Sequence, residues 1–150
     1  MEVKTSQMEK IAKGKKILPH EYSGRVRVMA GKMPDQYDTI AVGSTILLGQ
    51  MPVNSRILGL SLVSCAAGTA SSKLNIGLRE RDTGTVIDED GIAAGLDIAT
   101  AGMKPANTGA MVTGGDEYIT KKSVDVYATV VGAAVAANQK IKFEIFYVVD

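Results

Sequence analysis

Residues 124–130, VDVYATV, and residues 141–147, IKFEIFY, decide the fold class of this chain of 150 residues. In both stretches the side chains alternate with a period of two, which places the two sets on opposite faces of an extended strand. The core-forming sets are Val124, Val126, Ala128 and Val130 in the first and Ile141, Phe143, Ile145 and Tyr147 in the second. Both stretches are therefore predicted to be β-strands with one face toward a core.

Similar patterns recur along the rest of the chain. Alternation predicts strands at 26–30, 58–62 and 74–78, with shorter candidates at 39–42, 45–48, 85–87 and 117–120. Turn-forming residues separate them, as in MPVNS at 51–55, RDTG at 81–84 and the loop 132–139. Residues 90–97, DGIAAGLD, are the one stretch predicted to hold a helical turn. Short strands without long helical patterns between them indicate an all-β sandwich or small barrel. Leu60 is expected to face the core, so that Leu60→Ala costs about 2–5 kcal/mol.

Charge divides the chain into a basic arm and an acidic body. Residues 1–33 carry eight basic and three acidic residues, a net charge of +5, whereas residues 34–150 carry nine basic and thirteen acidic residues, a net charge of −4. The body's first strand is expected to begin near residue 24. Within the arm, Ser6 and Glu9 match a capping box, and the short helix that it predicts ends at Gly14. The arm is either a frayed tail or a segment that docking on a partner orders.

The sequence contains no recognisable metal-binding motif, and no pair of carboxylates stands out as a catalytic pair, although partners far apart in sequence stay open. His20 and Cys65 are the only His and Cys, which is too few for a structural zinc site, and His20 is predicted to lie in an exposed loop. Cys65 ends an apolar run and is expected to be a core thiol. The acidic run 88–91, DEDG, lacks the spacing of a calcium loop. We therefore expect a protein that is not an enzyme and has no cofactor.

Composition also argues against nucleic acid and membranes as partners. The net charge of the whole chain is +1, too small for a nucleic-acid-binding surface. The rings of Phe143 and Tyr147 lie near lysines, but Glu144 and Asp150 offset that charge, so core packing is the favoured role. The apolar stretch 130–137 is far shorter than the ~20 residues of a membrane-spanning helix. A signal peptide is not evident at the start, and we expect a soluble protein made in a reducing cytoplasm.

Three short motifs carry a resemblance to a known group of proteins. They are PVNSRI at 52–57, NIGL at 75–78 and YVVD at 147–150. With the order of strands around them, residues 38–150 resemble small virion structural proteins of tailed bacteriophages, above all the decoration or cement proteins found beside the major capsid protein. The resemblance implies a jelly-roll-like β-sandwich of about eight antiparallel strands with an extended N-terminal arm. Residues 1–33 have no counterpart in it.

The resemblance also implies a function. It implies a non-enzymatic protein that binds the major capsid protein on the exterior of the head, assembles as a homotrimer and stabilises the shell. Two alternatives stay open: another virion subunit, in the tail or the head–tail connector, and a carbohydrate-binding surface module, which the absence of Trp disfavours. Because a basic arm on an acidic body favours docking on a neighbour, the expected capsid- or subunit-binding residues are Met8, Lys10, Ile11, Lys13, Lys15, Lys16, Arg25 and Arg27.

Overall fold

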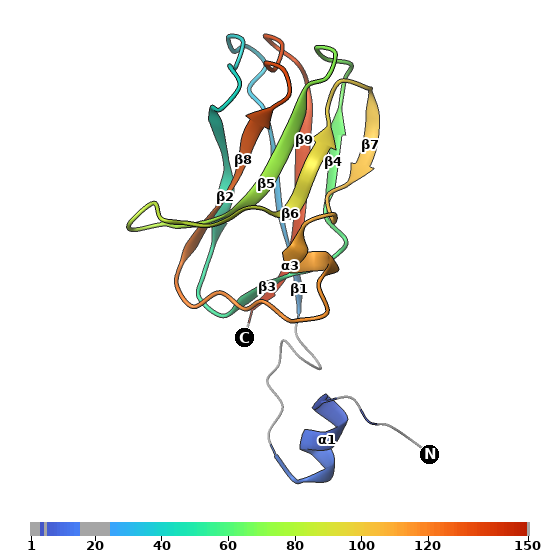
Figure 1. Cartoon of the computed structure of the whole chain (residues 1–150), viewed down its shortest axis with the longest axis vertical. Helices are drawn as coiled ribbons and strands as arrows, with labels where there is room; N and C mark the ends of the chain where they lie inside the picture. Colours follow the sequence, from blue (N-terminus) through green and yellow to red (C-terminus); the bar gives the residue numbers. More distant parts are fainter. Residues whose placement is uncertain (1–3, 5, 16–24, 150) are drawn as a thin grey trace.

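Two antiparallel β-sheets, packed face to face, make up the body of the protein in the computed structural model, which describes residues 4, 6–15 and 25–149 (Figure 1). The five-stranded sheet contains β1 (Val26–Lys32), β3 (Ser55–Ile57), β4 (Leu62–Cys65), β7 (Gly102–Pro105) and β9 (Ile141–Val149). The four-stranded sheet contains β2 (Thr45–Met51), β5 (Lys73–Glu80), β6 (Val86–Asp97) and β8 (Val124–Val131). Two short helices, α1 (Ser6–Ala12) and α3 (Ala110–Thr113), complete the described elements.

The order of the strands is that of a jelly roll. One sheet runs β1-β9-β4-β7, with β3 paired to the far end of β9, and the other runs β2-β8-β5-β6. The antiparallel pairs are nested along the chain: β1 pairs with β9, β2 with β8, β4 with β7, and β5 with β6. Such nesting is what two interleaved Greek keys produce when a long hairpin wraps into two sheets. The predicted all-β, jelly-roll-like sandwich is confirmed.

The core fills the space between the two sheets. Ile76 on β5 and Val126 on β8 face Ile145 on β9, and none of the three is accessible to solvent. The rim strand β1 contributes to this layer through Met29, which lies opposite Ile145 in the β1–β9 register. Alternate residues of each strand therefore point into one shared layer, as aligned sheet packing requires.

Most of the predicted strands and turns are confirmed. The stretches 26–30, 45–48, 74–78, 124–130 and 141–147 lie in β1, β2, β5, β8 and β9. The predicted hairpin turn at 81–84 joins β5 to β6, and Gly84 there has a φ of 72°, a conformation that glycine adopts without steric cost. The predicted helix in the arm is α1, and the chain turns at Gly14, whose N–H donates to Ile11 O at 2.9 Å.

The helical turn predicted at 90–97 is wrong, because this stretch is the second half of β6. The pairing of β6 with β5 shifts register at three places. At the three shifts β6 has one, three and one more residues than β5, which breaks the period of two. Ile92, Ala93 and Leu96 are consequently buried together from one strand, at a spacing that imitates a helix.

The strand predicted at 58–62 is also wrong. The chain makes β3, turns at 58–60 and begins β4 only at Leu62. Leu60 is 60% exposed, so its expected core position and the expected cost of Leu60→Ala are wrong, and the fully buried Val63 takes that role. The turn brings Ser61 beneath β9, where its Oγ accepts a hydrogen bond from Phe146 N at 3.0 Å. Because Ser61 makes this hydrogen bond to β9 it is buried, and the alternation of leucines around it does not mark a strand.

Two further short candidates are not strands, and three short elements were not predicted. In 39–42 only Ile40 forms a bridge, to Val135. The stretch 117–120 is irregular, but Thr120 binds the backbone of Ser55 through its N–H and its hydroxyl oxygen. The unpredicted elements are β3, with three residues, and β7 and α3, with four residues each. Segments this short carry too few side chains for periodicity to identify them.

Candidate interaction surfaces

The outward face of the five-stranded sheet carries apolar side chains at its rim. In the β1–β9 register, Met29 lies opposite Ile145 on the inward face, so the alternate residues Val26 and Val28 point outward. They are 52% and 53% exposed, although valine is among the residues most often buried. Phe146, half-buried, lies opposite Val28 and extends the apolar surface onto β9.

The same face continues across β4 and β7. Leu62 lies opposite both Glu144 and Pro105, and Ser64 lies opposite both Lys142 and Met103. Met103 is exposed, and so is Leu60 in the turn just before β4. We call the outward-facing set the sheet patch; its members are Val26, Val28, Leu62, Met103 and Phe146. Apolar side chains gathered on one face are typical of surfaces that contact another protein.

A basic hollow lies at the end of β1. It has a volume of about 490 Å³ and is lined by residues 32–35, 64–66 and 140–142. Lys32, Lys140 and Lys142 contribute positive charge, and Asp35 is the one acidic residue of the lining. Lys32 Nζ lies 3.7 Å from Asp35 Oδ1, but both side chains are largely exposed, so this ion pair is weak. The lining therefore carries a net positive charge on a surface that is otherwise mostly apolar.

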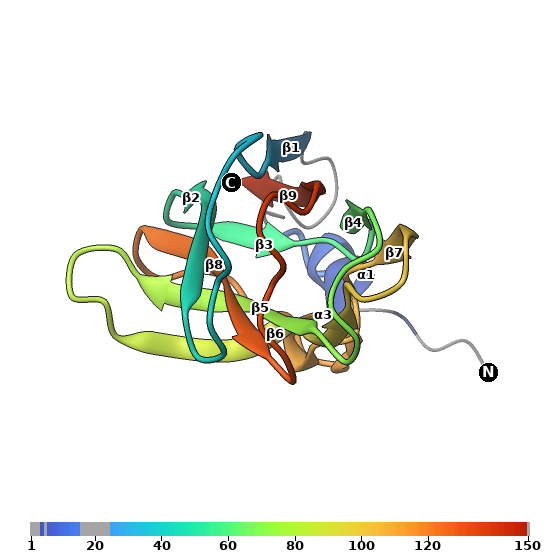
Figure 2. The ribbon, with the colours of Figure 1, turned by 90° about the horizontal axis from the view of Figure 1, so that it is seen from above.

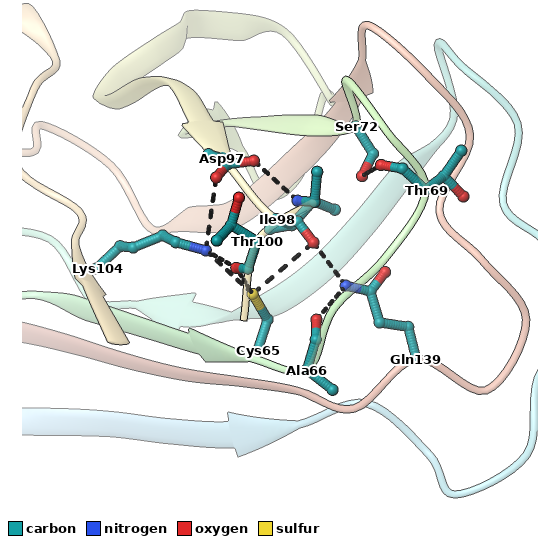
Figure 3. A network of polar contacts seen from close by, with 10 residues as sticks. Cys65, Ala66, Thr69, Ser72, Asp97, Ile98, Thr100, Lys104 and Gln139 are labelled. Atoms are coloured by element: carbon teal, nitrogen blue, oxygen red, sulfur yellow. Dashed lines mark hydrogen bonds and ion pairs between the residues drawn. The ribbon is translucent and has the colours of Figure 1, made fainter. Parts of the chain in front are cut away.

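Behind the hollow, a polar network ties the β6–β7 connection to β4 (Figure 3). Lys104 Nζ lies 3.4 Å from Cys65 Sγ and 3.8 Å from Asp97 Oδ2, and it also donates to Thr100 O. The thiol of Cys65 approaches Thr100 O at 3.3 Å. Cys65 is only half-buried, so the expected core thiol is wrong: its sulfur lies at the border of the core, among polar partners.

Gln139 closes the same network from the loop after β8. Its Nε2 donates to Ala66 O at 2.8 Å and to Ile98 O at 2.7 Å, which joins three segments far apart in sequence (Figure 3). Gly68 is needed beside it, because a Cβ there would lie 2.5 Å from the Gln139 amide. These contacts hold loops in place, and they give the network a structural role.

Hydrogen bonding in this network affects one ionisable group. Asp97 Oδ1 accepts from Ala99 N at 2.8 Å, and this bond, with contributions from Thr100 and Lys104, lowers the pKa of Asp97. The described residues include no cluster of three or more His, Cys, Asp or Glu side chains placed to hold a metal ion. Nor does the described part of the chain contain a helix long and apolar enough to cross a membrane.

The four-stranded sheet has a different outward face, where polar side chains are paired. Asp125 lies 3.3 Å from Arg79 Nε and 3.9 Å from Arg81 Nε, and it accepts a hydrogen bond from Gln50 at 3.3 Å. The guanidinium of Arg79 lies 4.9 Å from the ring centre of Tyr127. This cluster covers β8 and leaves it little exposed.

On β6 the acidic run is solvated in part. Asp88 Oδ1 accepts from Asp90 N at 3.2 Å. Partial burial, together with the neighbouring Asp90, raises the pKa of Asp88. The acidic run thus lies along a strand and not in a loop that wraps a cation.

The structure places the predicted arm residues on two separate elements. Met8 and Ile11 on α1 are 43% and 42% exposed, Lys10 is half-buried, and Lys13 and Lys15 follow the helix and are exposed. Lys16 and His20 lie outside the described residues. Arg25 lies directly before β1 and Arg27 within it, and both are exposed at the rim of the five-stranded sheet. Because Arg27 alternates with Val26 and Val28, it points to the face opposite the sheet patch.

Sequence reasoning missed the sheet patch and the lysines of the hollow. A signal was present in RVRV at 25–28, where valines alternate with arginines. Alternation alone does not show which set faces outward, and the lysines at 32, 140 and 142 come together only through the β1–β9 pairing. The capsid- and subunit-binding role of the eight arm residues stays a prediction.

Comparisons with known proteins found matches to solved structures and none to sequences. No family model matches the chain, and no curated protein sequence matches it. A solved structure described as the capsid of Ralstonia phage GP4 contains a chain that superposes with a TM-score of 0.67 at 16% identity, over 85% of this chain and 86% of that one. In the cyanophage Pam1 capsid asymmetric unit, a chain superposes with a TM-score of 0.64 at 16% identity, over the full length of both. At this identity the likeness establishes a shared fold.

Proposed function

We propose that this chain is a non-enzymatic structural protein of a bacteriophage head, of the decoration or cement type, that binds the major capsid protein on the exterior of the shell. The observation that carries the proposal is the likeness in fold to chains of two phage capsids, over 85% of this chain in one case and its full length in the other. A match over the whole chain supports a shared architectural role better than a match to one sheet would, since jelly rolls occur in many contexts.

The described surfaces support a role in protein–protein contact. The sheet patch exposes apolar side chains on one face of a rigid sheet, with a basic hollow at one end of it. Interfaces combine apolar centres with charged rims, and charge complementarity sets the register of the two partners. A cement protein needs such a surface, because its task is to hold neighbouring subunits of the shell together.

Binding to heads is the direct test. Heads assembled from the major capsid protein of the same genome, mixed with the purified full chain, are expected to carry it into the pellet on sedimentation, and cryo-electron microscopy is expected to place it outside the shell. Copy number in virions separates the alternatives: a decoration protein approaches the abundance of the major capsid protein, and a connector subunit is limited to one ring. A chain that joins neither heads nor virions would refute the proposal.

The proposed homotrimer and the role of the arm require a separate measurement. Light scattering after size exclusion is expected to give the mass of a trimer for the full chain. Deleting residues 1–23 is expected to leave the β-sheet circular dichroism unchanged, because β1 begins at Val26, and to weaken attachment to heads or trimer stability. A monomer at all concentrations would reject the trimer, and loss of the β signal would show that the arm is part of the core.

A further inference from the structure

Strand β1 is an edge strand to which another strand could pair. Among the residues that the structure describes, β1 pairs only with β9, and it lies at the rim of its sheet (Figure 2). All seven of its residues are in continuous register with β9, without a bulge. Six of the seven are exposed. A long, regular and exposed edge strand is a template for pairing with an added strand.

Three other rim strands are protected in ways that β1 is not, and β3, which also pairs with β9 alone, has three residues. Strand β7 has four residues and ends at Pro105, which has no N–H to donate. Strand β6 shifts register three times and packs against α3. Strand β2 shifts register between Leu47 and Gly49. Bulges, short length and a covering helix are the usual means of closing an edge.

The alternation of hydrogen bonds along β1 identifies which of its backbone N–H and C=O groups face the open side. Met33 N donates to Ile141 O at 2.9 Å, so odd-numbered residues of this segment bond toward β9. On the far side of β9, Phe146 O accepts from Leu58 N at 2.9 Å, which directs that carbonyl away from Val28. In an antiparallel pair the two sets alternate. The backbone groups of Val26, Val28, Ala30 and Lys32 therefore point to the open edge.

Charge selects the kind of strand that fits this edge. Residues 25–32 contain Arg25, Arg27 and Lys32 and no acidic residue, a net charge of +3. Lys140 and Lys142 add positive charge around the hollow at the end of the strand, against Asp35 and, beside Lys142 at 4.0 Å, Glu144. A second copy of β1 would bring three more cations against these, and facing like charges destabilise a strand pair. An acidic strand is attracted by the positive charge of this edge, whereas a second copy of β1 is repelled by it.

We propose that β1 accepts an extended acidic segment of a partner protein by β-strand addition, through the outward backbone groups of Val26, Val28, Ala30 and Lys32. Backbone hydrogen bonds give such a complex its affinity, and the flanking cations and the hollow give it its preference for acidic side chains. The identification of that partner as a capsid protein rests on the proposed function. The inference that β1 binds an acidic strand does not depend on it.

The probe is the unlabelled peptide EVEVEVEV, titrated at low salt into the full chain labelled with ¹⁵N. We expect the amide exchange of Val28 and Ala30 to slow by about tenfold at saturation, since those groups become hydrogen-bonded, while Met29 and Gly31, already bonded to β9, do not change. The peptide KVKVKVKV controls for charge, and EVEPEVEV controls for strand pairing. Equal binding of all three peptides, or protection without alternation along β1, would overturn the proposal.

Two variants test the backbone contact within the protein. Ala30→Pro removes an outward N–H without breaking a bond to β9, and rim strands tolerate proline at such positions; Ala30→Ser keeps the N–H. The serine variant is expected to bind the acidic peptide about tenfold more tightly than the proline variant. If Ala30→Pro does not fold, the double variant Arg25→Glu, Arg27→Glu replaces it and is expected to lose the acidic peptide. Unchanged binding in the folded variant would overturn the proposal.

Further outcomes separate this inference from its alternatives. If Val28 and Ala30 are protected in the protein alone and lose protection on dilution, the edge is occupied by a second copy, and the acidic partner is wrong. If the peptide binds as expected but heads do not take up the protein, the proposed function fails and the strand addition holds. If heads bind the wild type and Ala30→Pro equally, the strand addition fails and the proposed function holds.

Discussion

Strands β1 and β8 have similar sequences and opposite surroundings. Residues 26–30 read VRVMA and residues 124–128 read VDVYA, each with valine at alternate positions. In β8, which lies between β2 and β5, the first seven residues are buried and both faces are covered. In β1, at the rim beside β9, Val26 and Val28 face solvent. The comparison teaches that alternation identifies a strand, whereas the position of that strand in the sheet decides which face is covered.

The outward faces of β8 and β1 differ because side chains from neighbouring segments cover the first and not the second. On β8, Asp125 pairs with Arg79 and Arg81, and Tyr127 lies under the Arg79 guanidinium. Those partners come from β5 and the turn after it, on the neighbouring side of the sheet. Among the described residues, β1 pairs with β9 alone, and its valines extend outward beside Phe146. Rim strands have half the neighbours of central strands, and their outward side chains stay accessible.

The largest expected effect comes from removing the same side-chain atoms on both strands. Val126→Ala is expected to lower the free energy of unfolding by about 2 kcal/mol, since it removes buried methyl groups and leaves a cavity. Val28→Ala, at a 53% exposed position, is expected to change it by less than about 0.5 kcal/mol. Urea unfolding of both variants at one pH measures the difference. Equal costs would contradict the assignment of the two valines to opposite environments.

An intermediate effect is expected when the polar residues that alternate with the valines are changed. Asp125→Asn removes the charge that two arginines face at a nearly buried site, and it is expected to cost about 1 kcal/mol. Arg27→Gln on β1, an exposed position, is expected to cost less than about 0.5 kcal/mol. Thermal unfolding of the two variants beside the wild type gives the ranking, and a larger loss for Arg27→Gln would reverse the comparison.

The smallest effect on stability is expected at Asp97, at the connection where the chain crosses from one sheet to the other. Because hydrogen bonds lower the pKa of Asp97 below its ordinary value of 3.8, its carboxylate stabilises the fold above about pH 5, and this contribution is lost as the pH falls through the lowered pKa. Asp97→Asn is expected to melt below the wild type at neutral pH and to approach it in acid. The exposed Asp116→Asn serves as control. A melting-temperature difference that grows in acid would contradict the sign.

Local patterns predicted much of the fold, and the errors arise where partner strands change the local spacing. Alternation of the side chains identified β1, β2, β5, β8 and β9 because their register is regular over most of their length. It failed at 90–97, where bulges change the spacing of buried residues, and at 58–62, where a buried serine hydroxyl caps β9 from within a turn. Bulges and buried turns depend on partner strands, which the local sequence does not contain.

The candidate surface was predictable only in part. The arm residues were chosen by charge and their binding role stays a prediction; of these residues, Arg27 lies in β1 and Arg25 directly before it. The lysines at 32, 140 and 142 are more than a hundred positions apart at the extremes, and the strand register alone makes them neighbours. The open side of β1 was likewise not predictable, because it depends on which strands occupy the rims.

The sequence by itself determined that this chain builds short strands and turns at Gly84 and Asn54, because these properties depend on side chains near one another along the chain. Only the tertiary structure decided that the valines of β1 face outward and those of β8 face inward. The physical reason is that burial is set by neighbours: β8 lies between two strands and under a second sheet, and β1 borders an open edge.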